Sequence, residues 1–259
     1  MLFCAMQVKV SAVIITFNEE KNIERCLSSI TKVVDEIIVV DSFSTDATET
    51  ICNKYDVQFI QHEFKGHIEQ KNWAKDQATH DYVLSLDADE ALDVELISSI
   101  KAAKENWQFQ AYRMNRLTNY CGKWIRHSGW YPDTKTRLFD RRYGHWGGTN
   151  PHDKFIPNKA EKVSFLKGDI LHYSFYTREE HLKQIEKFST IGANALNKKG
   201  VKSSLLKIII KPIARFVKAF FVHKGFLDGS AGFTISRLSA YANYLKYSKL
   251  RILQEQTNK

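Results

Sequence analysis

The 259-residue sequence predicts an α/β fold in which helices flank a mostly parallel sheet. Three observations support this prediction. Apolar segments typical of buried strands alternate with segments of helical periodicity between residues 8 and 90. Several strand-like segments end in polar or acidic residues, and 43% of all residues are apolar, which is enough for a substantial core. Such alternation is typical of a parallel sheet with helices on both faces.

The first strand is expected over residues 8–16, where an apolar run ends at Thr16. The polar sequence Thr-Phe-Asn-Glu-Glu follows it, and Asn18 is a suitable N-cap for a helix with acidic residues in its first turn. Apolar residues three and four positions apart then predict the buried face of that helix: Ile23, Cys26, Leu27 and Ile30.

The alternation continues with further strands and helices. We expect strands over residues 36–41, 57–60 and 82–86, and helices over residues 47–55 and 67–79. Ligands of parallel sheets bind beyond the carboxyl ends of the strands. These ends carry polar and acidic side chains at Asn18, Glu19, Asp41, Asp87 and Asp89. The sequence therefore predicts a ligand site at this edge.

The strand over residues 82–86 ends in Asp87-Ala88-Asp89-Glu90. Two carboxylates at positions i and i+2 can turn toward one divalent cation, and Mg²⁺ and Mn²⁺ prefer oxygen ligands that include substrate phosphates. A single Asp-x-Asp is also typical of a solvated acidic turn. Acidic residues that recur at several strand ends favour the metal and diphosphate interpretation.

Three motifs follow one another at the ends of predicted strands: Thr16-Phe17-Asn18-Glu19, Val40-Asp41-Ser42-Phe43-Ser44-Thr45-Asp46 and Asp87-Ala88-Asp89. Together they resemble family 2 glycosyltransferases with the GT-A fold, and the resemblance covers roughly residues 8–155. It implies that the nucleoside pocket is lined by Thr16, Asn18, Glu19, Asp41 and Ser44. It also implies that Asp87 and Asp89 bind the diphosphate and Mg²⁺ or Mn²⁺, with Asp89 the more direct ligand. Lys71-Asn72 stands where the family often has Arg-Asn, so Lys71 is a candidate cation of the donor pocket.

The second half of the predicted catalytic region, residues 108–177, would bind the acceptor. Aromatic and arginine side chains are dense in this half, and aromatic rings stack on sugars while arginine binds phosphate. We select Trp124, Trp130 and Arg137 as acceptor-binding residues. Core packing is the alternative for such residues, and aromatic plus basic side chains also suit single-stranded nucleic acid.

Glycines precede His152-Asp153, which indicates a loop that closely approaches a ligand. Inverting transfer requires a general base for the acceptor hydroxyl, and the resemblance places an acidic residue here. We therefore predict Asp153 as the base, with His152 orienting it or contacting the leaving diphosphate. The alternative is that this pair caps a turn. His172 and Tyr173 are late pocket residues or ordinary buried residues.

The C-terminal region, residues 178–259, is expected to be helical. Its last part, residues 198–259, contains 13 Lys and Arg against only Asp228 and Glu255. Residues 205–223 form a basic amphipathic helix with a wide apolar face, as expected at a membrane interface or in a helix packed on the catalytic domain. Helices are also expected over residues 178–197 and 230–254. This tail resembles that of the subgroup that adds glucose or heptose to lipopolysaccharide cores.

Together these features predict a GT-A catalytic domain over residues 1–177, with its nucleotide-sugar half at residues 8–90. The expected activity is inverting transfer of a hexose from UDP-glucose or a similar donor to a lipid-linked glycan such as lipopolysaccharide core. Four well-separated cysteines indicate a reducing cytosol, so we expect a peripheral protein on the inner face of the cytoplasmic membrane. Residues 205–224 would contact anionic lipid, and no nucleic acid is expected. A peptide acceptor and a non-catalytic lipid or nucleic-acid binder are the alternatives.

Overall fold

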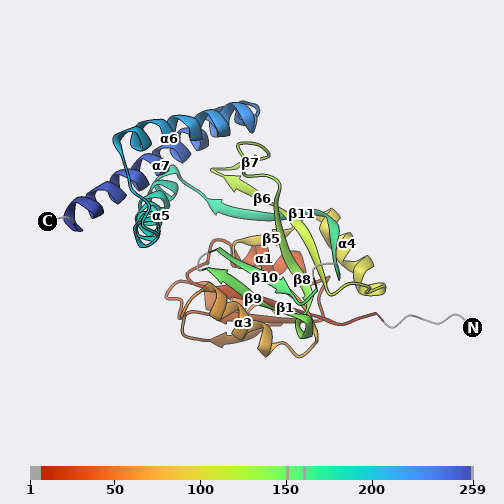
Figure 1. The fold of residues 1–259 in the computed structure, drawn as a ribbon. Coiled ribbons are helices and arrows are strands. Elements are labelled where there is room, and N and C mark those ends of the chain that lie inside the picture. The colour runs from red at the N-terminus through yellow and green to blue at the C-terminus, as the bar shows by residue number, and fades with distance from the viewer. Residues whose placement is uncertain (1–6, 150–151, 160–161, 258–259) are drawn as a thin grey trace, which may run out of the picture. The chain divides into compact units, whose positions relative to one another are not determined.

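The computed structural model describes residues 7–149, 152–159 and 162–257, without the side chains of His152 and Thr257. The chain divides into two compact units (Figure 1). The first unit comprises Met1–Arg116 and Asp133–Tyr173, and the second comprises Leu117–Pro132 and Ser174–Lys259. The expected acceptor half at residues 108–177 is thus shared between them, because Leu117–Pro132 lies with the C-terminal helices.

The first four strands form a parallel sheet, as the sequence predicts. They are β1 (Val10–Thr16), β2 (Glu36–Asp41), β3 (Gln58–Gln61) and β4 (Tyr82–Asp87). Their spatial order is β3-β2-β1-β4. In the register of the sheet, Thr16 lies beside Asp41 and Ile15 lies beside Asp87. The carboxyl ends of β1, β2 and β4 therefore meet at one edge.

Helices connect these strands at the expected places: α1 (Ile23–Ile30), α2 (Thr48–Cys52) and α3 (His67–Gln77). The four residues predicted for the core face of α1 are completely buried. The predicted cap is wrong, because Asn22 is the N-cap and Asn18 lies in the preceding loop at φ 53°. That loop is instead held by hydrogen bonds to the segment after β2. The helix α4 (Val94–Glu105) was not predicted from the sequence, and Asp93 caps it by accepting from Leu96 N.

The remaining strands convert the parallel sheet into a mixed one. The order continues from β4 through β8 (Asp133–Asp140), β6 (Ala111–Tyr120) and β11 (Val163–Phe175) to β5 (Glu90–Leu92), and β7 (Lys123–Ile125) pairs with β6. The pairs β4–β8, β8–β6 and β11–β5 are antiparallel. A short 3-10 turn, Arg141–Tyr143, follows β8.

A separate two-stranded sheet of β9 (Gly144–Thr149) and β10 (His152–Pro157) belongs to the first unit. Phe155 of β10 stacks on Phe139 of β8, with ring centroids 3.7 Å apart. Asn72 of α3 donates to the Trp146 carbonyl oxygen (2.8 Å) and accepts from Trp146 N (2.9 Å). These contacts hold β9 and β10 against α3 and β8.

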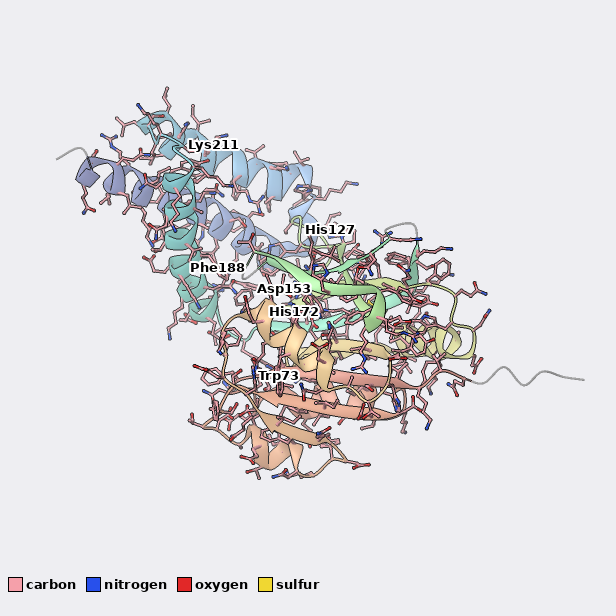
Figure 2. The ribbon with its side chains drawn as sticks, turned by 60° about the horizontal axis from the view of Figure 1, so that its bottom comes forward. Trp73, His127, Asp153, His172, Phe188 and Lys211 are labelled. Atoms are coloured by element: carbon pink, nitrogen blue, oxygen red, sulfur yellow. The ribbon has the colours of Figure 1, made fainter. Side chains whose placement is uncertain are left out.

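The second unit contains three long helices. They are α5 (Arg178–Lys198), α6 (Leu205–Val217) and α7 (Gly229–Thr257), and their positions agree with the sequence analysis. A π-helical segment, Lys218–Val222, continues α6, and the 3-10 turn Gly225–Asp228 leads into α7. Figure 2 labels Phe188, which belongs to α5, and Lys211, which belongs to α6. Among the described residues, no helix has the length and apolar character needed to cross a membrane.

The core of the second unit joins Leu117–Pro132 to these helices. Tyr120, Phe175 and Ile235 are buried there, and Trp130 packs against them. The buried carboxylate of Asp228 accepts hydrogen bonds from the backbone N–H groups of Arg126 (3.2 Å) and His127 (3.0 Å). One side chain, from the 3-10 turn that precedes α7, thus accepts from two successive N–H groups of this loop.

Candidate active site

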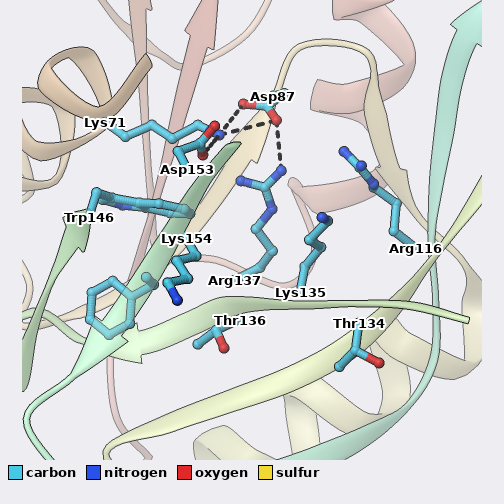
Figure 3. Close-up of a pocket in the computed structure, with 11 residues that line it drawn as sticks. Lys71, Asp87, Arg116, Thr134, Lys135, Thr136, Arg137, Trp146, Asp153 and Lys154 are labelled. Atoms are coloured by element: carbon cyan, nitrogen blue, oxygen red, sulfur yellow. Dashed lines mark hydrogen bonds and ion pairs between the residues drawn. The ribbon is translucent and has the colours of Figure 1, made fainter. Parts of the chain in front are cut away.

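A cavity of about 500 Å³ opens in the first unit at the carboxyl end of β4 (Figure 3). Side chains from α3, β4, β6, β8, β9 and β10 line it. The charged ones are five cations and two carboxylates: Lys71, Arg116, Lys135, Arg137, Lys154, Asp87 and Asp153. This excess of positive charge suits an anionic ligand such as a diphosphate.

Lys71 connects the two carboxylates of the cavity. Its Nζ lies 2.9 Å from Asp87 Oδ1 and 2.7 Å from Asp153 Oδ2, and its side chain is only 3% exposed (Figure 3). Lys71 comes from α3, Asp87 from the end of β4 and Asp153 from β10. The structure thus brings together a predicted donor-pocket cation, a predicted metal residue and the predicted base.

Arg137 of β8 provides a second buried cation beside Asp87. Its Nη2 donates to Asp87 Oδ2 (2.7 Å) and to Glu90 Oε1 (2.7 Å). Desolvation favours the neutral form of Asp87, but the charges of Arg137 and Lys71 outweigh it and hold the pKa of Asp87 well below its usual range. Arg137 was expected to contact the acceptor, and here it contacts a residue of the predicted diphosphate site.

Asp89 has a different partner. Its Oδ2 lies 3.1 Å from His172 Nε2, and His172 belongs to β11. Burial would raise the pKa of Asp89, but His172 outweighs this effect and the pKa is lowered. Asp89 is therefore ionised near neutral pH and lies beside a ring nitrogen that is a common metal ligand.

The chemistry of this pair fits a divalent cation in part. A carboxylate oxygen and an imidazole nitrogen are both metal ligands, and Asp89 Oδ2 and His172 Nε2 lie 3.1 Å apart, at hydrogen-bond distance. No group of three or more His, Cys, Asp or Glu side chains in the described residues is arranged to hold a metal. A cation at this pair would thus take its remaining ligands from water and substrate oxygens.

The predicted nucleoside residues lie together at the ends of β1 and β2. Asp41 is fully buried and accepts from Ser44 N (2.8 Å) and Ser44 Oγ (2.5 Å). Asn18 N donates to Ser44 Oγ (2.7 Å), and Asn18 Oδ1 accepts from Thr45 N (2.8 Å). The buried Thr16 hydroxyl has no hydrogen-bond partner among the described residues, so a ligand can satisfy it.

Glu19 follows Asn18 in the loop after β1, and its carboxyl group has an unusual pKa. Burial raises its pKa to about 7, and the negative charges of Asp89, Asp46 and Asp87 contribute, while a hydrogen bond from Asn22 Nδ2 (2.7 Å) opposes the rise. In the part of the chain that the structure describes, no Lys or Arg lowers the pKa of Glu19 in the way that Lys71 lowers that of Asp87. A pKa perturbed by burial and by neighbouring carboxylates is typical of functional sites.

Some residues of this region were not anticipated from the sequence. Glu90 is the completely buried partner of Arg137, and the only signal for it was an acidic residue beside the Asp-Ala-Asp motif. Phe17 and Phe43 directly precede Asn18 and Ser44, which are joined by a hydrogen bond. Both Phe side chains are more than half exposed. Phe43 also has φ 61°, a strained conformation for a bulky residue that points to a functional constraint.

Other predicted site residues lie elsewhere or are not described. Trp124 belongs to β7 of the second unit. Trp130 packs with Tyr120, Phe175 and His181 in the core of that unit. His152 begins β10, but its side chain is outside the described part of the chain. An acceptor role for Trp124 and Trp130 stays a prediction, as does the role of His152 in orienting Asp153 or contacting the diphosphate.

Comparison with known proteins gives consistent matches. The family model described as Glycosyl transferase family 2 matches residues 11–202. An uncharacterized glycosyltransferase of Rickettsia bellii is 34% identical, over 96% of this chain and 88% of the relative. The lipopolysaccharide core biosynthesis glycosyltransferase LpsC of Rhizobium meliloti is 25% identical, over 94% and 92% of the two chains. The crystal structure of S. aureus TarS 1–349 aligns with a TM-score of 0.46 at 17% identity, over 96% and 91% of the chains.

Proposed function

Since the chain belongs to glycosyltransferase family 2 and has the GT-A fold, we propose that it transfers a hexose with inversion from UDP-glucose or a similar nucleotide sugar. One observation carries this proposal. Lys71 links Asp87 at the end of β4 to Asp153 of β10 within one cavity. The predicted diphosphate residue and the predicted base thus line the same cavity, where one sugar could reach both.

The donor would lie along the edge formed by β1, β2 and β4. Thr16, Asp41 and Ser44 offer hydrogen-bonding groups for the nucleoside, and the exposed rings of Phe17 and Phe43 offer apolar faces to the base. The diphosphate would then meet Lys71 and Arg137. Arg137 Nε and Trp146 Nε1 are buried without a hydrogen-bond partner among the described residues, and phosphate oxygens can accept from both.

A divalent cation, Mg²⁺ or Mn²⁺, would be held by Asp89 with His172, and it would offset negative charge on the leaving nucleotide. Asp87, the second predicted metal residue, is already paired with two cations. Its role in this proposal is to fix Lys71 and Arg137 toward the diphosphate. These two side chains would contribute to stabilising the leaving group through fixed positive charge.

Asp153 would act as the general base. It accepts the proton of the acceptor hydroxyl while the hydroxyl oxygen forms a bond to the anomeric carbon and the bond from that carbon to the diphosphate breaks. The pairing with Lys71 orients the Asp153 carboxylate in the cavity. When phosphate competes for Lys71, the carboxylate becomes available to the acceptor.

The acceptor proposed is a lipid-linked glycan at the inner face of the cytoplasmic membrane, with lipopolysaccharide core as the leading candidate. The similarity to LpsC over nearly the whole chain supports this choice. The basic, partly apolar second unit supports a position at an anionic membrane surface.

Incubation with labelled UDP- and GDP-sugars and a lipopolysaccharide-core acceptor, with and without EDTA, tests the proposal. Asp153→Asn should lower turnover by about 10²–10⁴-fold and leave UDP binding intact. Asp89→Ala should weaken metal-dependent UDP binding as well as transfer. The matched control is Asp76→Asn, an exposed residue of α3, which should behave as wild type. Full turnover by Asp153→Asn would exclude it as the base.

A further inference from the structure

The helix α6 and its continuation to Val222 have one face that packs within the second unit. Ile208, Pro212, Phe216 and Phe220 recur every four residues along this face and are half-buried. Phe216 and Phe220 both contact the ring of Phe233 in α7, with centroid distances of 5.9 and 5.8 Å. The packed face accounts for only part of the apolar residues of α6.

A second face of α6 is apolar and exposed. We call it the apolar row, and its members are Leu206, Ile209, Ile210, Ile213, Val217 and Phe221. Their exposure ranges from 43% for Val217 to 68% for Leu206. Isolated exposed apolar residues are ordinary, but a continuous row along one helix indicates an interaction surface.

Basic residues form a third face of the same helix. Lys207, Lys211, Arg215 and Lys218 recur at three- and four-residue intervals, and Lys211 marks this stripe in Figure 2. None of the four forms an ion pair with a carboxylate within residues 7–149, 152–159 and 162–257. Burial, followed by the charges of Arg215 and Lys211, lowers the pKa of Lys246 in α7. Several cations therefore lie close together without an acidic partner.

Acidic side chains are almost absent from this part of the chain. Residues 198–259 contain 13 Lys and Arg but only Asp228 and Glu255. Asp228 is buried against loop backbone, and Glu255 is paired with Arg251 at 2.7 Å. The surface around α6 thus presents uncompensated positive charge next to apolar side chains. An anionic lipid bilayer complements both features, since it offers phosphate groups above an apolar interior.

We propose that α6 lies in the interface of an anionic bilayer, with the apolar row below the headgroups and Lys211, Arg215 and Lys246 on lipid phosphates. This inference deepens the proposed function. Membrane binding would bring the site to a lipid-linked acceptor, and that purpose rests on the proposed function. Binding itself is independent of the transfer chemistry. The two hypotheses can therefore fail separately.

Flotation of the purified full chain with vesicles tests the proposal. Wild type should float with vesicles of phosphatidylcholine containing about 30% phosphatidylglycerol and only weakly with phosphatidylcholine alone. Ile210→Gln combined with Ile213→Gln should abolish flotation with both. The matched control, Ile252→Gln, changes an exposed apolar residue of α7 outside the apolar row and should float as wild type.

A second pair of variants tests the charge. Lys211→Gln combined with Arg215→Gln should weaken binding to anionic vesicles by about 25-fold, since each basic residue near such a surface contributes about 1 kcal/mol. Lys183→Gln with Lys187→Gln, on exposed positions of α5, is the control. All variants should bind UDP as wild type does, which separates lipid binding from the donor site.

Failure of wild type to float with anionic vesicles would overturn the inference, as would unchanged flotation of the Ile210→Gln, Ile213→Gln variant. Light scattering separates a protein partner from a lipid surface. The wild-type chain could instead form a dimer and not bind vesicles. If the Ile210→Gln, Ile213→Gln variant is then monomeric, the apolar row serves self-association.

Discussion

The Glu19 carboxyl group allows the clearest quantitative test of the site. Its pKa is about 7 in the folded chain, against 4.5 for the ordinary group, and burial is the main cause. Because the pKa of this carboxyl group is higher in the folded state than in the unfolded state, the free energy of unfolding decreases as the pH rises from 4.5 through 7. From these two values, ionisation of Glu19 costs up to about 3 kcal/mol at pH 8 and about 1 kcal/mol at pH 5.

Glu19→Gln removes this cost, because Gln is neutral and its Oε1 can still accept from Asn22. We expect the variant to be more stable than wild type by up to about 3 kcal/mol at pH 8, and to lose most of this advantage at pH 5. Urea denaturation in EDTA at both pH values measures the difference. Donor binding should weaken at the same time, since stabilising changes at functional sites commonly reduce function.

The control for this experiment is Glu24→Gln, which changes an exposed carboxylate in the first turn of α1. Its effect on stability should be small and nearly independent of pH. A difference between Glu19→Gln and wild type that stays constant from pH 5 to pH 8 would refute the argument from burial. A variant that is less stable than wild type at pH 8 would refute it as well.

Three further predictions concern stability and binding. Burial lowers the pKa of His181 from 6.5 to about 4, so wild type should lose up to about 3 kcal/mol as the pH falls from 6.5 to 4; His181→Gln should remove this loss, as measured by urea denaturation across that range. Lys71→Met leaves two carboxylates of the cavity without their shared cation and should cost about 3–5 kcal/mol, whereas Lys71→Arg should retain UDP binding by calorimetry. Gly168 has φ +93°, and a Cβ there would lie 2.2 Å from Leu96 N, so Gly168→Ala should lower the melting temperature strongly. Gly122→Ala, with φ +85° but open space around it, should lower it by the smaller amount that backbone strain alone requires.

The sequence predicted that polar side chains meet at the carboxyl ends of β1, β2 and β4, because this arrangement depends on local patterns. Apolar runs and helical spacing fixed the order of β1, β2, β4 and their helices, and a parallel sheet aligns the carboxyl ends of its strands. The side chains that follow those strands, such as Asp41 and Asp87, must then share an edge. Nothing about long-range packing was needed for this step.

The ion pairs of the cavity were beyond sequence reasoning. Lys71 and Asp153 are 82 positions apart, and their contact depends on how β9 and β10 pack against α3 and β8. Arg137 was predicted to bind the acceptor, but its bonds to Asp87 and Glu90 follow from the antiparallel pairing of β8 with β4. Local patterns do not specify that pairing. Trp130 shows the same limit, because its place in an aromatic core depends on Leu117–Pro132 joining the second unit.

The division of the chain also separates its two proposed tasks. The donor residues, Lys71 and Asp153 all belong to the first unit, and the apolar row with its basic stripe belongs to the second. Substitutions in α6 should therefore change lipid binding while UDP binding stays constant, and substitutions of Asp89 should do the reverse. With a lipid-linked acceptor, loss of vesicle binding should lower transfer by reducing the local concentration of acceptor. With a short water-soluble acceptor analogue, the same α6 variants should retain wild-type turnover, because the proposed donor residues and base lie outside α6.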